Sequence, residues 1–454
     1  MKTLIKNGTV VNAAGSSRAD VLLEGDRVSQ VGRNLRAPGA ELVEAEGCYV
    51  FPGFIDTHTH FDLDLGYTKT ADDFITGTRA ALLGGTTTVL DFATQTRGGT
   101  LRQALGLWQE KARGSSCNYG FHMALAQWND KVAAELPEMT RQGITSYKMY
   151  LVYDGLKVDD GALYSALKAA KKENALIGVH CENWEVLLRR IPEVKAAGIT
   201  SPEGHPLSRP DDVEAEAVAR YLRIARLAEA PAYIVHLSTL EGLVEAQRAR
   251  ARGQEVYLET CPQYLLLTEE RYCQADGAKF VMSPPLRKKE DNEALWNACA
   301  QGEIDAIGTD HCSFTMAQKA RGKNDFSLTP NGGAGVQHRG QLIYTYGVAT
   351  GLLTLEQMAE LLSRRPAQLF GLRDRGILQP GTAADVVVWD PSAKGCITDD
   401  NSAHHCDNSP FAGFSVQGGA RDVFLNGRRV VNDWTLVETG TGKYLHRKGY
   451  QKLR

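Results

Sequence analysis

In the first quarter of the chain, the stretch GFIDTHTHFD (residues 53–62) places His58 and His60 two positions apart, directly after an apolar run. Side chains two apart on a β-strand point to the same face, so the two imidazoles would lie side by side at a strand end. Paired imidazoles are typical ligands of zinc and related cations. The pair alone fits a polar strand end equally well, so a metal site needs further ligands from elsewhere in the chain.

Further candidate ligands stand at or near the ends of other apolar, strand-like runs. They are Lys148 in SYKMYL, His180 in GVH, His236 in IVHL and Asp310 in GTD. Each alone has an ordinary interpretation: a core histidine bonded to a carbonyl group, a lysine reaching solvent, or an aspartate capping a helix. Together, four imidazoles and a carboxylate suit cations such as zinc, and they exceed what one tetrahedral catalytic site uses.

Two metal ions in one site need a bridging anion, and Lys148 offers one. A plain ammonium would be repelled by two dications, whose field lowers the pKa of the lysine and favours the neutral amine. A neutral amine takes up carbon dioxide to form a carbamate, a two-oxygen anion able to span both ions. The candidate site thus consists of two divalent ions and the residues His58, His60, Lys148, His180, His236 and Asp310.

The runs that carry these residues belong to a longer series of predicted strands separated by helical segments. The strands are expected at residues 53–58, 86–93, 119–126, 144–151, 175–180, 232–237, 255–260 and 305–310. This series predicts an α/β fold, a (β/α)8 TIM barrel, in which working residues gather at the C-terminal ends of the strands. The alternative, a doubly wound open sheet, would show a Gly-rich phosphate loop where this chain has THTHFDLDLG.

Both ends of the chain show short β-type runs and turn signals. Asn7-Gly8, Gly25-Asp26 and Asn426-Gly427 each have the composition of a hairpin turn. We therefore expect a small β-sandwich domain built from both termini, residues 1–52 plus 375–440. The barrel would occupy residues 53–374, and residues 441–454 would form a C-terminal tail.

Composition narrows the classes of partner and compartment. The 454 residues carry a formal net charge of −3, which gives no sign of a nucleic-acid partner. The longest apolar runs, such as DVVVWD, are too short to span a membrane, and the start MKTLIKNGTVVN lacks the features of a signal peptide. Nine cysteines without a CxxC pair are typical of reduced thiols. These observations predict a cytoplasmic protein.

Motifs along nearly the whole chain resemble those of the cyclic amidohydrolases, in particular the dihydropyrimidinase and D-hydantoinase branch. They include PGFIDTHTHF, SYKMYL, VHCEN, SPEGHPLSRP, TCPQYLLL, SPPLR, GTDHCSF and PNGGAGV. The resemblance implies two metal ions, usually zinc, bridged by a hydroxide and by the carbamate of Lys148. One ion would be held by His58, His60 and Asp310, and the other by His180 and His236. It also implies a homotetramer.

The reaction implied by the resemblance is hydrolytic ring opening of a hydantoin or a 5,6-dihydropyrimidine. Asp310 would carry the proton from the attacking hydroxide to the leaving nitrogen. Tyr153, in KMYLVYDG, matches the family tyrosine whose hydroxyl donates to the developing oxyanion, although a packed aromatic at the barrel rim is its ordinary reading. Ser283 and Asn331 match positions that bind the imide edge of the substrate, and each also fits an ordinary turn.

Two positions depart from the family pattern. The family usually has a glutamate where this chain has Gln337, and often a proline where it has Ala334. Neither position is a metal ligand, so the chemistry should survive. The departures affect the support of the Asn331 loop and with it the substrate preference.

Three competing functions remain to be weighed. A dihydroorotase would carry an arginine at the position of Asp62, and an allantoinase would differ in HTHFDLDLG and SPEGHPLSRP. The collapsin response mediator proteins share the fold, but they have lost metal ligands and act as scaffolds. Because this chain keeps all six ligand positions, an enzyme is expected.

Other histidines lie outside the predicted centre. We expect His205 to be structural, and His311 together with Cys312 to orient the neighbouring Asp310. His404 and His405 are expected at the surface.

Overall fold

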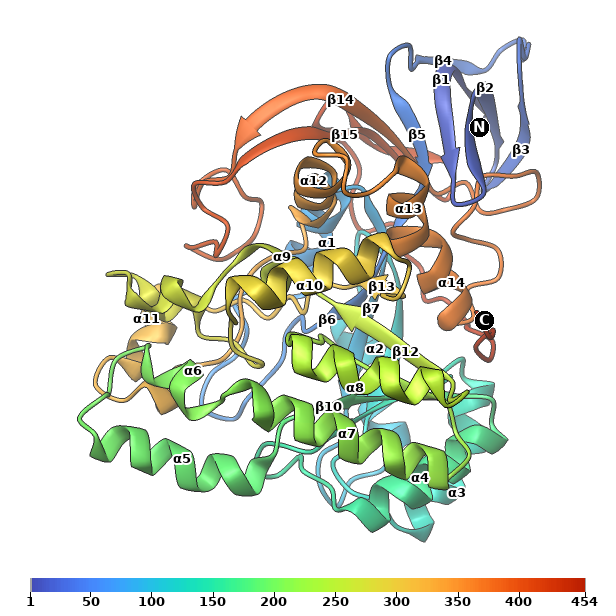
Figure 1. Cartoon of the computed structure of the whole chain (residues 1–454). Coiled ribbons are helices and arrows are strands. Elements are labelled where there is room, and N and C mark those ends of the chain that lie inside the picture. Colours follow the sequence, from blue (N-terminus) through green and yellow to red (C-terminus); the bar gives the residue numbers. More distant parts are fainter. Residues whose placement is uncertain (1, 454) are drawn as a thin grey trace.

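A computed structural model, which describes residues 2–453, contains a barrel of eight parallel strands (Figure 1). Each strand pairs with the next in chain order, as a (β/α)8 barrel requires. The strands are β6 (Phe54–Thr59), β7 (Thr86–Thr94), β8 (Asn118–Ala124), β9 (Ser146–Tyr150), β10 (Leu176–His180), β11 (Ala232–Ile234), β12 (Val256–Thr260) and β13 (Ala306–Ile307). The predicted fold class is confirmed.

The barrel closes between its first and last strands through the segment that follows β13. The backbone N–H of His60 donates to the carbonyl of His311 at 2.8 Å, and Thr59 forms a parallel bridge with His311. Gly308 permits this approach, since a Cβ there would lie only 3.0 Å from the Cβ of His58. The residues after β13 therefore lie directly beside the end of β6.

Helices surround the barrel and bury their apolar sides against it. They are α1 (Phe74–Leu83), α2 (Leu101–Lys111), α3 (Asp130–Arg141), α4 (Asp160–Lys172), α5 (Trp184–Ala196), α6 (Gly204–Ser208), α7 (Asp211–Leu227), α8 (Leu240–Ala251), α9 (Pro262–Leu266), α10 (Lys289–Ala300), α11 (Met316–Lys319), α12 (Arg339–Ile343), α13 (Leu355–Ala359) and α14 (Arg365–Leu369). Short 3₁₀ segments are η1 (Glu269–Cys273), η2 (Gly277–Phe280), η3 (Ala320–Gly322) and η4 (Phe326–Leu328), and π-type segments are η5 (Tyr344–Val348) and η6 (Glu360–Arg364).

Local sequence explains where these helices begin. Asp73 caps α1 by accepting from the backbone N–H groups of Ile75 and Thr76, and the N–H of Asp73 donates to the hydroxyl oxygen of Thr76.

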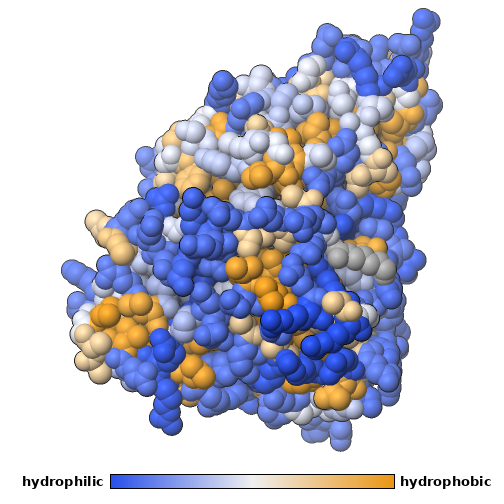
Figure 2. Space-filling view, viewed as in Figure 1, coloured by the Kyte–Doolittle hydropathy of each residue, from blue (hydrophilic) through white to orange (hydrophobic). Residues whose placement is uncertain are grey.

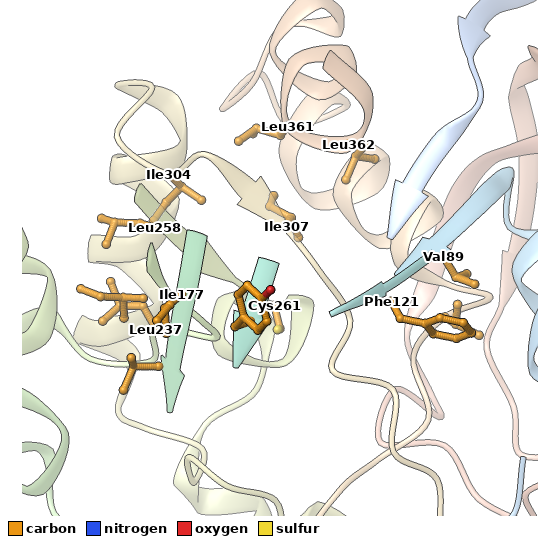
Figure 3. Packing of buried hydrophobic residues seen from close by; sticks show 14 of the residues in the cluster. Val89, Phe121, Ile177, Leu237, Leu258, Cys261, Ile304, Ile307, Leu361 and Leu362 are labelled. Atoms are coloured by element: carbon orange, nitrogen blue, oxygen red, sulfur yellow. The ribbon is translucent and has the colours of Figure 1, made fainter. Parts of the chain in front are cut away.

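Inside the fold, Ile307 of β13 belongs to the same buried cluster as Leu361 and Leu362 of η6, as Figure 3 shows. This packing holds the end of β13 in place.

A second, nine-stranded sheet combines both ends of the chain. Its strands are β1 (Lys2–Asn12), β2 (Gly15–Glu24), β3 (Arg27–Gly32), β4 (Glu41–Glu44), β5 (Tyr49–Pro52), β14 (Val386–Cys396), β15 (Ser415–Leu425), β16 (Arg428–Asn432) and β17 (Thr435–Leu436). β5 joins the two ends, because it pairs with β1 on one side and with β14 on the other. A small β domain built from both termini is thus confirmed, while the predicted domain boundaries stay predictions.

One of the three turn predictions in this domain is wrong. Gly25-Asp26 and Asn426-Gly427 connect paired strands, but Asn7 and Gly8 lie inside β1, where the register with β2 shifts. Asn7 has a φ of 62°. Its N–H donates to Asp20 at 2.9 Å, so the pair forms an irregularity within the strand rather than a hairpin.

The C-terminal tail lies against the N-terminal ends of the barrel strands. Leu445 donates to the carbonyl of Tyr119 at 2.7 Å, close to the start of β8. The buried guanidinium of Arg447 donates to Ser146 Oγ at 2.8 Å and to the carbonyl of Phe121. The tail therefore covers the end of the barrel opposite the strand ends that carry the predicted ligands.

The exterior gives no support for a membrane span. Within residues 2–453, no helix combines the length and the apolar character needed to cross a bilayer. On the face seen in Figure 2, hydrophilic residues predominate and hydrophobic residues form separate patches.

Candidate active site

The histidine pair from the end of β6 meets Asp310 from beyond β13. Oδ1 of Asp310 lies 3.2 Å from Nε2 of His58 and 3.2 Å from Nε2 of His60. The centroids of the two imidazole rings are 5.2 Å apart. The three ligands predicted for one metal ion thus come together at one point.

The other three predicted ligands lie beside this group. The ring centroids of His180 and His236 are 4.5 Å apart, and Nζ of Lys148 is 3.4 Å from Nε2 of His236. His236 connects the two halves, since its ring centroid is 5.3 Å from that of His58. The ligand atoms of His58, His236 and Asp310 all lie within 4.8 Å of one another.

Burial sets the protonation of this cluster. It holds the pKa of His58 and His236 well below the usual value and lowers the pKa of His180, which favours the neutral form of these three imidazoles. Burial also lowers the pKa of Lys148 to about 8. Burial alone would raise the pKa of Asp310, but its basic neighbours outweigh that effect and hold the pKa below its usual value. A carboxylate among neutral imidazoles is the ligand form that divalent cations require.

Buried nitrogen atoms without hydrogen-bond partners also fit a metal centre. Nε2 of His58 and Nδ1 of His236 are buried without a hydrogen-bond partner among residues 2–453. A buried polar atom without a partner costs free energy, and a coordinated cation removes that cost. The donor set of nitrogen and oxygen atoms suits zinc-like ions.

Of the predicted substrate-binding residues, Tyr153 lies beside His180, and Ser283 and Asn331 lie on two neighbouring segments. The ring centroid of Tyr153 is 5.3 Å from that of His180. Gly332, next to Asn331, donates to the carbonyl of Val281 at 3.0 Å, which brings the Asn331 segment beside the Ser283 segment. Ser283 is buried, and its Oγ has no hydrogen-bond partner among the described residues.

Comparison with known proteins now identifies the family. A model described as "Amidohydrolase family" matches residues 49–430. The chain belongs to the amidohydrolase family. It is 43% identical to a D-phenylhydantoinase of Escherichia coli (strain SE11) over 458 residues, covering 99% of each chain.

Solved structures agree with this assignment. A dihydropyrimidinase from Brevibacillus agri superposes with a TM-score of 0.98 at 39% identity, covering 99% of both chains. The L-hydantoinase (dihydropyrimidinase) from Arthrobacter aurescens gives a TM-score of 0.90 at 26% identity, covering 97% of this chain and 99% of that one. The expected resemblance to the dihydropyrimidinase and D-hydantoinase branch is confirmed.

Two buried carboxylates that were not predicted from the sequence form hydrogen bonds with histidines of this amidohydrolase. Glu259, from β12, accepts from the hydroxyls of Thr57 at 2.6 Å and Tyr233 at 2.7 Å. It lies 2.6 Å from Nδ1 of His58, which therefore donates, leaving Nε2 free as a ligand. Glu182 supports His180 in the same way. Its carboxylate lies 2.7 Å from Nε2 of His180, which leaves Nδ1 as the ligand atom.

Replacement of Glu259 by glutamine is expected to weaken metal binding about 10- to 100-fold, the usual effect of losing such a carboxylate. The neutral amide holds the His58 ring less firmly and makes its Nε2 a poorer ligand. Competition of the purified variant against a chelator measures the affinity. Glu245→Gln, on the surface of α8, is the control, and equal affinity in both variants would contradict the role of Glu259.

Backbone geometry marks the same positions. Tyr153, His236 and Asp310 have φ values of 73°, 39° and 51°. Left-handed backbone at residues other than glycine costs about 1–3 kcal/mol each and persists only where surrounding contacts enforce it. The contacts around the site therefore hold these three side chains in place.

Three of the histidines outside the predicted ligands, His205, His311 and His404, have buried structural surroundings. Nε2 of His205 donates to the carbonyl of Met282 at 2.8 Å. His311 pairs with the buried Asp72 at 3.1 Å, and its Nδ1 accepts from the N–H of Gly335, so it braces the strand end that carries Asp310. The expectation of a surface position is wrong for His404, which is buried against the ring of His311.

The departure at Gln337 also has a structural explanation. Its Oε1 accepts from the backbone N–H of Ala403 at 2.7 Å. A glutamate accepts the same bond, so the amide preserves this link to the C-terminal segment.

Proposed function

We propose that this amidohydrolase opens the ring of cyclic amides by metal-dependent hydrolysis. Its substrates are 5,6-dihydropyrimidines, which give N-carbamoyl-β-amino acids, or 5-substituted hydantoins, which give N-carbamoyl-amino acids. The observation that carries the proposal is the convergence of four histidines, a lysine and an aspartate at the strand ends. The resemblance to D-phenylhydantoinase supports the substrate class.

The metal centre follows from the same residues. His58, His60 and Asp310 would hold one divalent ion and His180 and His236 the other, and zinc suits this donor set. The amine of Lys148 attacks carbon dioxide, one N–C bond forms, and a proton leaves to solvent. The resulting carbamate would supply an anion beside His236, whose Nε2 lies 3.4 Å from Nζ of Lys148. When bound, the two ions supply a strong nucleophile at neutral pH and polarise the substrate carbonyl.

The side chains around the ions complete the reaction. Water adds across one C–N bond of the ring, with the hydroxyl going to carbon and the proton to nitrogen. Asp310 takes the proton from the attacking water and delivers it to the leaving nitrogen. Tyr153 donates its hydroxyl hydrogen to the developing oxyanion. Ser283 and Asn331 bind the imide edge, mainly through their backbone groups.

A substrate panel with metal analysis tests this proposal. Purified protein is assayed against dihydrouracil, 5-substituted hydantoins, allantoin and dihydroorotate, with chiral analysis of the products. We expect about two divalent ions per chain, as such binuclear sites contain, and hydrolysis of dihydrouracil or hydantoins. Activity restricted to allantoin would assign an allantoinase. Less than one ion per chain without any hydrolysis would instead favour a scaffold.

Replacement of Tyr153 by phenylalanine is expected to lower kcat about 10²- to 10³-fold, the effect of removing one oxyanion donor. Metal content should stay unchanged, because the tyrosine hydroxyl holds no ion. Steady-state kinetics and metal analysis measure both quantities. Tyr164→Phe, at the exposed face of α4, is the matched control, and an unaltered kcat would remove Tyr153 from the oxyanion role.

Three further properties belong to this proposal. The division into residues 1–52 plus 375–440, 53–374 and 441–454 is the proposed domain organisation. From the resemblance we infer a homotetramer, which analytical ultracentrifugation tests. We also propose a cytoplasmic location, with small cyclic amides rather than nucleic acid or membranes as partners.

A further inference from the structure

Lys319, the last residue of α11, is a fully buried lysine outside the metal centre. Its Nζ donates to three backbone carbonyls, those of Val281 at 2.7 Å, Pro330 at 2.8 Å and Gly332 at 2.6 Å. No carboxylate within residues 2–453 forms an ion pair with it, and the ring of Phe314 lies 5.7 Å away. All three donors of the ammonium are thus used on main-chain oxygens.

The three carbonyls belong to two segments that are far apart in the chain. Val281 stands two residues before Ser283, whereas Pro330 and Gly332 flank Asn331. Besides the Lys319 bond, the Val281 carbonyl also accepts from the N–H of Gly332 at 3.0 Å. Lys319 therefore joins the two segments that we propose to meet the imide edge of the substrate.

The same connection continues toward the catalytic aspartate. The N–H of Cys312, two residues after Asp310, donates to the carbonyl of Gly333 at 3.1 Å. Gly332 has a φ of 144°, and a Cβ there would lie 2.2 Å from the carbonyl oxygen of Cys312. The Asn331 segment is consequently packed tightly between Lys319 on one side and the Asp310 segment on the other.

The energetics of this arrangement depend on the ammonium group. An apolar side chain of similar length would fill the space, but it would leave buried carbonyl groups without their charged donor. The Val281 carbonyl would keep one bond from Gly332, while those of Pro330 and Gly332 would lose the Lys319 donor. Without that donor the two segments are free to shift relative to each other and to Asp310.

We propose that Lys319 is a positioning residue that sets the spacing between the Ser283 and Asn331 segments, and through this spacing the affinity for the cyclic imide. The proposal rests on the proposed function of the site. Lys319 differs from the proposed metal ligands, because its three hydrogen bonds go to the two proposed substrate-binding segments. A defect at Lys319 should therefore appear in substrate binding and leave the metal centre intact.

Lys319→Met tests this role in the purified metal-loaded enzyme. We expect KM to rise about 10- to 100-fold, since misplacement of binding groups by about 1 Å has effects of this size. Metal content should stay at the wild-type value and kcat should change much less than KM. Lys319→Arg keeps a charged donor and should restore part of the affinity. The control is Lys279→Met, at a nearby lysine that forms an ion pair with Asp276.

A second measurement does not depend on turnover. Amide hydrogen exchange should become faster in peptides that cover residues 281–286 and 328–336 of Lys319→Met, and should stay unchanged elsewhere in the barrel. If the methionine variant does not fold, Lys319→Gln, which keeps a donor, receives the same measurements. Wild-type KM together with unchanged exchange would overturn the proposal. A wild-type protein inactive on every cyclic amide would overturn the proposed function, while the exchange result would still decide whether Lys319 holds the segments.

Discussion

Lys148→Ala is expected to lose most of the tightly bound metal and about three orders of magnitude in turnover, the scale of one charged group in a water-excluded site. The side chain is buried, and its Nζ lies 3.4 Å from Nε2 of His236. In the proposed centre, two dications without an anion at this place would repel each other strongly. Metal analysis and kcat/KM of the purified variant measure both losses.

Addition of a short carboxylic acid provides the decisive control for this variant. The alanine leaves space for a two-oxygen anion of about the size of the carbamate, so propionate should restore part of the metal content and part of the activity. Lys168→Ala, on the outer helix α4, should behave as wild type with and without the acid. Full metal content and full turnover in Lys148→Ala would contradict the bridge.

The elements that could be predicted are those with a strong local pattern. His58 and His60 follow an apolar run, and Lys148 and His180 lie within buried strands, so the period of a strand and the strand-end rule located them. The barrel followed from the same runs. These features depend only on residues a few positions apart.

Strand lengths near the site could not be predicted. Residues 305–310 were expected to form the eighth strand, but β13 contains only Ala306–Ile307. The carboxylate of Asp56 accepts from both the N–H and the hydroxyl of Thr309, at 3.0 Å and 2.7 Å, and this contact turns the backbone out of the strand. Asp310 follows with a positive φ. The competing contact comes from a residue more than two hundred positions away.

The supporting residues were missed for the same reason. Glu259 and Lys319 act through partners that only the tertiary fold brings near. One local signal existed for Glu259, since it is a charged residue inside the otherwise apolar run VYLET. A charged residue is almost never fully buried without a partner, so its position in such a strand indicates a buried contact.

Asp310→Asn is expected to lower kcat about 10²- to 10⁴-fold, the contribution of one positioned proton-transfer group. The substitution is well matched to the site. Asparagine has nearly the same shape, and it tolerates the left-handed backbone that Asp310 adopts at a φ of 51°. The variant therefore keeps the fold and the approach to His58 and His60 while losing the negative charge and the ability to take up a proton.

The pattern of losses separates proton transfer from metal binding. The amide oxygen can still face the two Nε2 atoms that lie 3.2 Å from Asp310 Oδ1. The variant should therefore retain the ion that we propose for His180 and His236, and bind the other proposed ion more weakly. Saturating the assay with zinc should then restore metal content without restoring kcat. Asp64→Asn, exposed and paired with Lys69, is the control. If zinc restored full turnover, Asp310 would act only in metal binding, and another group would have to transfer the proton.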